Sequence, residues 1–262
     1  GTLPNGGTFN GTGQLSLDAG SSQYVVLPSG ILSNYTALTV EAWVTATTDP
    51  VNSMLYAFGN TDGGGTGEQY IFGSLNRDYT AITANDPGYT AEQGAGGGSA
   101  LPLNQAIHFV GVYNPAGGYI AVYTNGVLHA INNGETDPLS VVSPVEAFIG
   151  KSVYNGDPYA SLTLDEFRIY NGALSPDELA ATQILGPTQL LSTNVSLSAS
   201  ISSGNVTLSW PLTGAGFSLQ SNSSLTSGTW TTVATPAPQI IGNRWQITVP
   251  KSTGNQFFRL AR

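Results

Sequence analysis

Residues 164–170 read LDEFRIY, and residues 171–179 continue as NGALSPDEL. Successive side chains of an extended strand point to opposite faces, so alternation predicts that Asp165, Phe167 and Ile169 share one face. A lone carboxylate is therefore expected beside two large apolar side chains. The first stretch predicts a β-strand with an unusual polar residue on its apolar face.

The second stretch contains the start signals of a helix. Ser175 suits the N-cap, Pro176 suits the first helical position, and Glu178 stands where it can close a capping box. These signals predict a short helix over residues 176–182. It is the one helix that the sequence predicts.

The remainder of the first 170 residues shows short alternating runs between Gly, Asn and Pro, which is typical of an all-β domain. The clearest hairpin spans residues 119–131, where Asn125 and Gly126 supply the positive φ angles of a type I′ turn. Trp43 follows the core-facing alternation of its run and is predicted to lie in the core. The other runs are residues 14–17, 24–27, 38–44 and 107–113.

Three stretches together resemble LamG-like jelly-roll domains of the concanavalin A-like lectin/glucanase superfamily. The 164–170 strand is similar to the family's closing signature, the 119–131 hairpin to its Asn-Gly hairpin, and residues 9–44 to its opening. The resemblance covers roughly residues 8–185. It implies a concanavalin A-like jelly-roll sandwich, which we assign to a first domain at residues 1–187.

Composition changes around residues 186–194, and a second domain is predicted at residues 188–262. Tyr is absent after this point, whereas three of the four Trp occur there. Alternating runs such as VTLSW at 206–210 and WQITV at 245–249 predict a small antiparallel β-sandwich. The pattern resembles fibronectin III-like modules that are attached to secreted polysaccharide-acting proteins.

Charge and composition restrict the partners. The formal net charge is -9 with only 7 Lys+Arg, which argues against nucleic acid and anionic membranes because both need clustered cations. The absence of Cys excludes disulfides and thiolate chemistry. No apolar stretch is long enough for membrane insertion. Few charged and many uncharged polar residues are typical of secreted β-proteins, so a secreted or extracellular protein is expected. A monomer is expected, with an oligomer as the open alternative.

The glucanases of the superfamily hydrolyse sugars with paired carboxylates, so a catalytic chain is expected to carry such a pair. Their Glu-x-Asp-x-x-Glu signature is absent, Glu41 is isolated, and Asp165 and Glu166 point to opposite faces. A polysaccharide hydrolase or lyase built on the loop carboxylates Glu68 and Asp86 remains the alternative. An adhesin-type, protein-binding domain is a further alternative.

Calcium is the metal that the resemblance implies. In superfamily members with a similar closing strand, the matching Asp holds a structural calcium together with backbone oxygens near the amino terminus. Carried over, this makes Asp165 the side-chain ligand and Gly13 a carbonyl ligand, in keeping with the preference of calcium for oxygen. The open alternative is that Asp165 only accepts hydrogen bonds from loop amides.

Carbohydrate binding is the function that the sequence favours. Sugars are bound by aromatic faces with polar side chains alongside, and loop tyrosines have few structural reasons to exist. Such residues cluster at 56–92 and 154–159. The chain is predicted to be a non-catalytic carbohydrate-binding module that holds a polysaccharide in a tyrosine-rich loop groove. The predicted ligand-binding residues are Tyr56, Asn60, Arg77, Asp78, Tyr79, Asp86, Tyr89, Tyr154, Asp157 and Tyr159.

Overall fold

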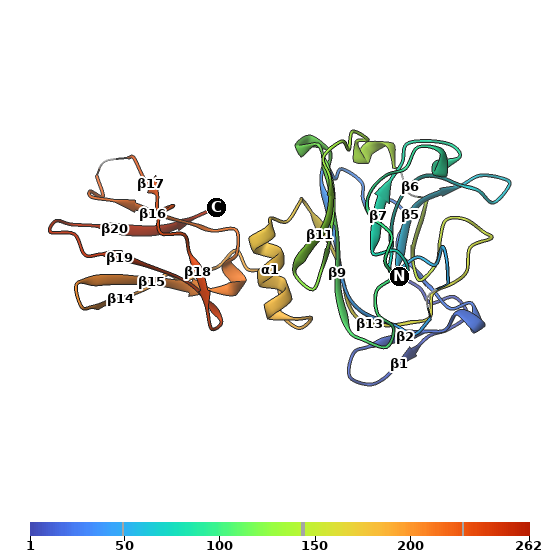
Figure 1. The fold of residues 1–262 in the computed structure, drawn as a ribbon, viewed down its shortest axis with the longest axis horizontal. Coiled ribbons are helices and arrows are strands. Elements are labelled where there is room, and N and C mark those ends of the chain that lie inside the picture. The colour runs from blue at the N-terminus through green and yellow to red at the C-terminus, as the bar shows by residue number, and fades with distance from the viewer. Residues whose placement is uncertain (49, 143–144, 227) are drawn as a thin grey trace. The chain divides into compact units, whose positions relative to one another are not determined.

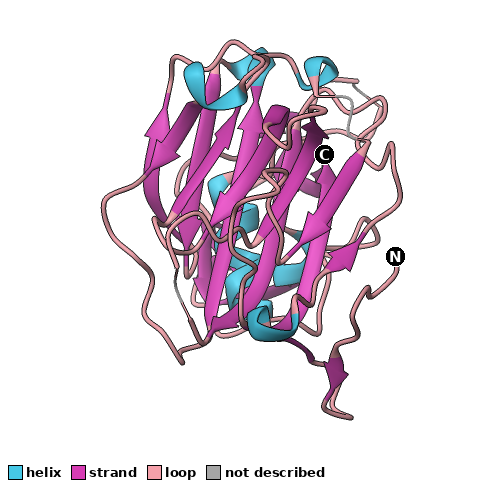
Figure 2. Cartoon of the chain, turned by 90° about the vertical axis from the view of Figure 1, so that its right-hand side faces the viewer, coloured by secondary structure: helices cyan, strands magenta, loops and turns pink. Residues whose placement is uncertain are grey.

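A computed structural model describes residues 1–48, 50–142, 145–226 and 228–262. The chain divides into two compact units, Gly1–Leu174 and Ser175–Arg262 (Figure 1). Strands dominate both units, and the helices among the described residues are few and short (Figure 2). None of these helices has the length and apolar character needed to cross a lipid bilayer.

The first unit is a sandwich of two antiparallel sheets in its described residues. The seven-stranded sheet has the order β1 (Thr8–Phe9), β2 (Leu15–Leu17), β13 (Leu162–Asn171), β4 (Leu38–Ala46), β9 (Ile107–Asn114), β10 (Tyr119–Thr124), β11 (Val127–Asn132). The six-stranded sheet has the order β3 (Val25–Val26), β12 (Glu146–Ile149), β5 (Tyr56–Thr61), β6 (Gly67–Ser74), β7 (Tyr79–Ile82), β8 (Gln93–Gly96). Alternate residues of both sheets form one apolar core, in which Val40 and Phe58 are fully buried. The predicted jelly-roll sandwich is confirmed.

The predicted Asn-Gly hairpin is also confirmed. Strands β10 and β11 pair antiparallel, and Asn125 and Gly126 between them have φ angles of 52° and 76°. Such angles match the right-handed twist of the flanking strands, which is why Asn-Gly is favoured there.

Strand β13 departs from simple alternation at Asp165. Its pairing with β4 shifts register between Leu164 and Glu166, so Asp165 is the extra residue of a β-bulge. Leu164 lies in the core, Phe167 and Ile169 pack against it, and Asp165 is exposed. The expectation that Asp165 shares the face of these apolar residues is therefore wrong.

The second unit begins with helix α1 (Pro176–Leu185). Ser175 Oγ accepts a hydrogen bond from the Glu178 N–H, and the Glu178 carboxylate accepts one from the Ser175 N–H, so the predicted capping box is confirmed. The helix runs three residues beyond the predicted end because Ala181 and Leu185 pack into the core of the second unit. The sequence-based division at 187/188 had placed this helix in the first domain, whereas the compact units divide after Leu174.

Two sheets form the rest of the described second unit. One has the order β14 (Ser198–Ser202), β15 (Asn205–Pro211), β19 (Arg244–Pro250), β18 (Gln239–Ile241), and the other β17 (Thr231–Thr232), β16 (Ser218–Asn222), β20 (Phe257–Ala261). Leu208, Trp210, Leu219 and Trp245 are buried in one apolar cluster. The prediction of a small C-terminal β-sandwich is confirmed.

Candidate functional site

The outer face of the six-stranded sheet carries an apolar cluster of its own. On strand β6, Ile71 points into the main core, whereas Tyr70 and Phe72 point to the opposite face. They pack there with Met54 and Val153 from neighbouring loops. Because β6 is apolar on both faces, its outer face is expected to be covered or to form a site.

A cavity of about 320 Å³ lies over this cluster. Its lining comes from four separate segments of the chain, so the fold must be complete before the site exists. Apolar and polar side chains are mixed in it, as in most small-molecule sites. The lining residues are Asn52, Met54, Ala57, Tyr70, Phe72, Arg77, Tyr89, Glu92, Ser152, Val153, Tyr154 and Asp157.

Tyrosine hydroxyls form a hydrogen-bonded chain along the cavity. The Tyr89 N–H donates to the Tyr154 hydroxyl at 3.1 Å, which donates to the Tyr70 hydroxyl at 3.3 Å. The Tyr70 hydroxyl donates to Glu92 Oε1 at 2.5 Å. Burial, followed by the hydrogen bond to Glu92, raises the pKa of Tyr70, so this hydroxyl stays a donor. These hydrogen bonds fix the positions of the Tyr154 and Tyr70 rings in the lining.

Arg77 is held by aromatic rings. Its guanidinium carbon lies 4.8 Å from the centre of the Tyr79 ring and 5.5 Å from that of Phe72. Such cation–π contacts orient the planar guanidinium without using up its donors. The arrangement places a fixed positive charge in the lining of the cavity.

Asp157 supplies a partly buried carboxylate on the same cavity. Burial raises its pKa, and a hydrogen bond from Ser152, the positive charge of Arg77, a hydrogen bond from Asn52 and the charge of Lys151 oppose this rise. A carboxylate accepts hydrogen bonds whereas a guanidinium only donates them. The cavity therefore offers both kinds of partner to the hydroxyl groups of a ligand.

Residues 19–180 match the sequence profile of the concanavalin A-like lectin/glucanases superfamily. The chain belongs to this superfamily. The unit Gly1–Leu174 is accordingly called the concanavalin A-like unit below. No curated protein matches the chain in sequence.

Several solved structures are similar to the chain. A mutant of NanB sialidase from Streptococcus pneumoniae is 17% identical with a TM-score of 0.54, over 96% of this chain and 40% of that one. The receptor-binding domain of botulinum neurotoxin mosaic serotype C/D is 14% identical with a TM-score of 0.51, over 79% and 55%. Domain 4 of AbnA, an extracellular arabinanase from Geobacillus stearothermophilus solved with arabinotriose, is 20% identical with a TM-score of 0.48, over 69% and 80%. At these identities the likeness shows the fold alone.

Four of the ten predicted ligand-binding residues line the cavity of the concanavalin A-like unit: Arg77, Tyr89, Tyr154 and Asp157. Tyr79 lies beside it and supports Arg77. Sequence reasoning left six polar or large apolar lining residues out of its ten. They are Asn52, Met54, Tyr70, Phe72, Glu92 and Ser152. For Tyr70 and Phe72 the signal was available, since they flank Ile71 in a strand that is apolar on both faces.

The other five predicted residues do not line the cavity. Tyr56 is fully buried in the main core, where its hydroxyl contacts those of Thr80 and Tyr113. The Asp78 carboxylate is buried, accepts both its hydrogen bonds from Thr124 and pairs with His129 at 3.2 Å. The polar groups of Tyr56 and Asp78 are therefore bonded within the protein and contribute to the fold.

The remaining three predicted residues lie on other parts of the surface. Asn60 Oδ1 accepts a hydrogen bond from the Val145 N–H. The Tyr159 ring packs 5.6 Å from that of Tyr24. Asp86 is exposed on the loop that precedes Tyr89. Loop position alone therefore did not identify a common site.

The carboxylates of the hydrolase alternative are close to each other but lie outside the cavity. Burial raises the pKa of Glu68, and the neighbouring charges of Asp86 and Asp62 add to this rise. Hydrogen bonding between the Glu68 and Asp86 carboxyls raises it further. The two groups are thus available as a pair on the surface, apart from the aromatic lining.

The predicted calcium ligands lie on strand β13, for Asp165, and in the loop before its neighbour β2, for Gly13. Leu164 pairs with Leu15, which brings Asp165 beside the segment that contains Gly13. Asp165 Oδ2 accepts a hydrogen bond from Gln14 Nε2 at 3.2 Å, and its carboxylate is exposed. Within the described ranges no group of three or more Asp, Glu or His side chains could hold a metal. One exposed carboxylate with backbone carbonyls fits a weak calcium site and not a tight one.

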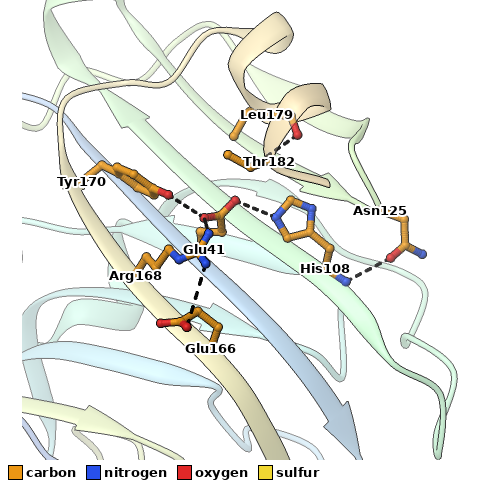
Figure 3. Close-up of polar contacts among 8 residues, drawn as sticks. All are labelled: Glu41, His108, Asn125, Glu166, Arg168, Tyr170, Leu179 and Thr182. Carbon is orange, nitrogen blue, oxygen red and sulfur yellow. Dashed lines mark hydrogen bonds and ion pairs between the residues drawn. The ribbon is translucent and has the colours of Figure 1, made fainter. Parts of the chain in front are cut away.

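A second polar cluster lies on the outer face of the seven-stranded sheet (Figure 3). Glu41 Oε1 is 2.8 Å from His108 Nε2, while Oε2 accepts hydrogen bonds from the Tyr170 hydroxyl at 2.8 Å and from Arg168 Nη1 at 3.3 Å. The Trp43 ring stacks on His108 at 4.3 Å, so Trp43 lies outside the core and its predicted placement is wrong. Glu41, which is isolated in the sequence, is the shared hydrogen-bond partner of three side chains.

Proposed function

We propose that the concanavalin A-like unit is a non-catalytic carbohydrate-binding module that holds a polysaccharide or oligosaccharide in the cavity over strands β5 and β6. The observation that carries the proposal is the combination of aromatic rings with Arg77 and Asp157 around one cavity. Rings contact the C–H faces of sugars, and the charged side chains donate to and accept from hydroxyls. Membership of a superfamily named for its lectins supports the same class of ligand.

We also propose where the protein acts and what its second unit does. Low charge and abundant uncharged polar residues support secretion of a protein that acts on polysaccharides. The two sheets of the second unit, with four and three described strands, support a fibronectin III-like accessory module. We also propose that Asp165 and the Gly13 carbonyl hold a weak structural calcium.

Binding is tested by isothermal titration of the protein with glycans selected on an array. Tyr89 is 66% exposed, so Tyr89→Ala should leave the fold intact while removing one wall of the cavity. We expect about a tenfold loss of affinity, the size of one good aromatic contact. Tyr159→Ala is the matched control, because it removes a loop tyrosine outside the cavity. Equal affinity of both variants and the wild type would refute this site.

The same glycans distinguish binding from catalysis. Incubation with the wild-type protein should leave chain lengths unchanged. Release of shorter chains that is lost in Glu68→Gln or Asp86→Asn would establish the hydrolase alternative. A blank array together with capture of a protein partner would establish the adhesin alternative.

A further inference from the structure

The size of the cavity restricts how much of a glycan it holds. Its volume of about 320 Å³ is at the lower end of the roughly 300–1,000 Å³ found for small-molecule sites. A site of this volume takes a small number of sugar rings. The cavity is thus a small pocket, whereas the sequence predicted a tyrosine-rich loop groove.

One side of the cavity is closed by direct packing. A Cβ atom on Gly88 would lie 2.1 Å from the Tyr70 ring, and one on Gly67 would lie 2.5 Å from the Tyr154 ring. The backbone at these two positions therefore touches the rings without a gap. The hydrogen bond from the Tyr89 N–H to Tyr154 joins the same two loops. A sugar chain has no passage through this wall.

The charge of the lining restricts the kind of sugar. Arg77 is the one Lys or Arg among the described lining residues, which also include two carboxyl groups, Asp157 and Glu92. An anionic sugar would gain one attraction and meet two repulsions at short range. Uncharged hydroxyls instead find donors and acceptors side by side. The lining therefore favours a neutral sugar.

We propose that this pocket binds the end of a neutral glycan chain, one or two sugar residues deep, and not a stretch within the chain. The inference rests on the proposed carbohydrate-binding function and narrows it. A closed wall and a small volume leave more room for a chain that ends inside the pocket than for one that continues through it. The number of sites on a polysaccharide then equals the number of accessible chain ends.

The test counts binding sites per gram of glycan. The full chain is titrated with arabinan, galactan, mannan and dextran, each as the long polymer and after partial acid hydrolysis, and with polygalacturonate as the acidic probe. For a linear neutral glycan that binds, shortening the chains tenfold should raise the binding capacity per gram about tenfold. The dissociation constant per site should stay the same.

Three results would overturn the inference, and they are distinguishable. Binding whose capacity per gram does not change with chain length would refute end recognition while leaving the carbohydrate-binding function intact. Tighter binding of polygalacturonate than of every neutral glycan would refute the preference for neutral sugars. No binding by any polymer or fragment would refute the proposed function together with the inference.

Discussion

The concanavalin A-like unit carries polar side chains on the outer faces of both its sheets, and the two faces use them differently. On the seven-stranded sheet, both oxygens of Glu41 are engaged by side chains of β9 and β13. On the six-stranded sheet, Arg77 and Asp157 line a cavity. In the first cluster the carboxylate is engaged by side chains of the protein, whereas the second cluster faces space that a ligand can fill.

This difference has an energetic meaning. A buried charge is costly unless it is paired and hydrogen-bonded. Where the partners belong to the chain, the charged group contributes to the fold. Where the partners are left to a ligand, the group contributes to binding. Substitutions on the first face should therefore lower stability, and substitutions on the second face should lower affinity.

The largest effect is expected at Glu41. Glu41→Ala removes the shared acceptor of His108, Arg168 and Tyr170 and takes away the 3.3 Å ion pair of the buried Arg168 guanidinium. Breaking a buried ion pair in this way costs about 3–5 kcal/mol, measured as the free energy of unfolding in urea. Asp157→Ala is the control on the other face and should cost much less. Equal losses in the two variants would remove the distinction between the faces.

A third carboxylate, that of Glu135, tests the cost of a buried charge that lacks an ion-pair partner among the described residues. Glu135 is 1% exposed, and both of its carboxylate oxygens are buried. Burial raises its pKa from 4.5 to about 7. A carboxyl with a raised folded-state pKa stabilises the fold fully below the unfolded pKa, and this stability is lost as pH rises through the folded pKa.

We therefore expect Glu135 to lower the free energy of unfolding by about 3 kcal/mol between pH 4.5 and 8, as the shift implies. Glu135→Gln cannot ionise and should lose this dependence. The free energy of unfolding in urea is measured for both proteins at pH 4.5 and pH 8. The change between the two pH values in the variant is then subtracted from the change in the wild type. If the two proteins respond to pH in the same way, Glu135 is not a buried unpaired carboxyl.

A smaller effect is expected in the pocket. Asp157→Asn keeps the shape but removes the charge, and the loss of charged hydrogen bonds to sugar hydroxyls should lower affinity about tenfold. Because burial raises the pKa of Asp157, binding by the wild type should weaken at a higher pH than for an ordinary Asp as the solution is acidified.

Asp78→Asn is the matched control for Asp157→Asn in glycan titrations and urea unfolding. Both carboxylates are predicted ligands by sequence, but Asp78 is occupied by Thr124 and His129. Its replacement should lower stability and leave affinity unchanged. The opposite pattern in the two variants would reverse the assignment of these carboxylates.

The sequence predicted the fold well where the signal is local. The hairpin at Asn125 and Gly126 and the helix start at Ser175 depend on neighbours within a few residues, and both formed as expected. The prediction from alternation was wrong at Asp165, because one extra residue in β13 reverses which face of the sheet the following side chains point to. It failed at Trp43 because both faces of β4 are largely buried, so burial does not identify the core side.

The pocket was harder to predict than the fold. Its lining joins residues near 52, 70–77, 89–92 and 152–157, and no local rule states which loops meet. Tyr56 and Tyr89 are both tyrosines close to turns, yet one is in the core and the other is exposed. Their difference depends on strand register and on long-range packing. Residue type identified candidates, and only the three-dimensional arrangement separated residues that line the cavity from residues of the core.

The smallest effect is expected at Asp165, which belongs to neither face. It is exposed and accepts a hydrogen bond from Gln14, so in EDTA the change Asp165→Asn should alter the free energy of unfolding by less than about 0.5 kcal/mol. With millimolar calcium, the wild type should gain stability according to the ratio of calcium to its dissociation constant, whereas Asp165→Asn should gain less. Thermal melts of both proteins in EDTA and in calcium measure this difference. If calcium shifts neither melt, or both equally, Asp165 holds no calcium, and its hydrogen bond with Gln14 is its whole role.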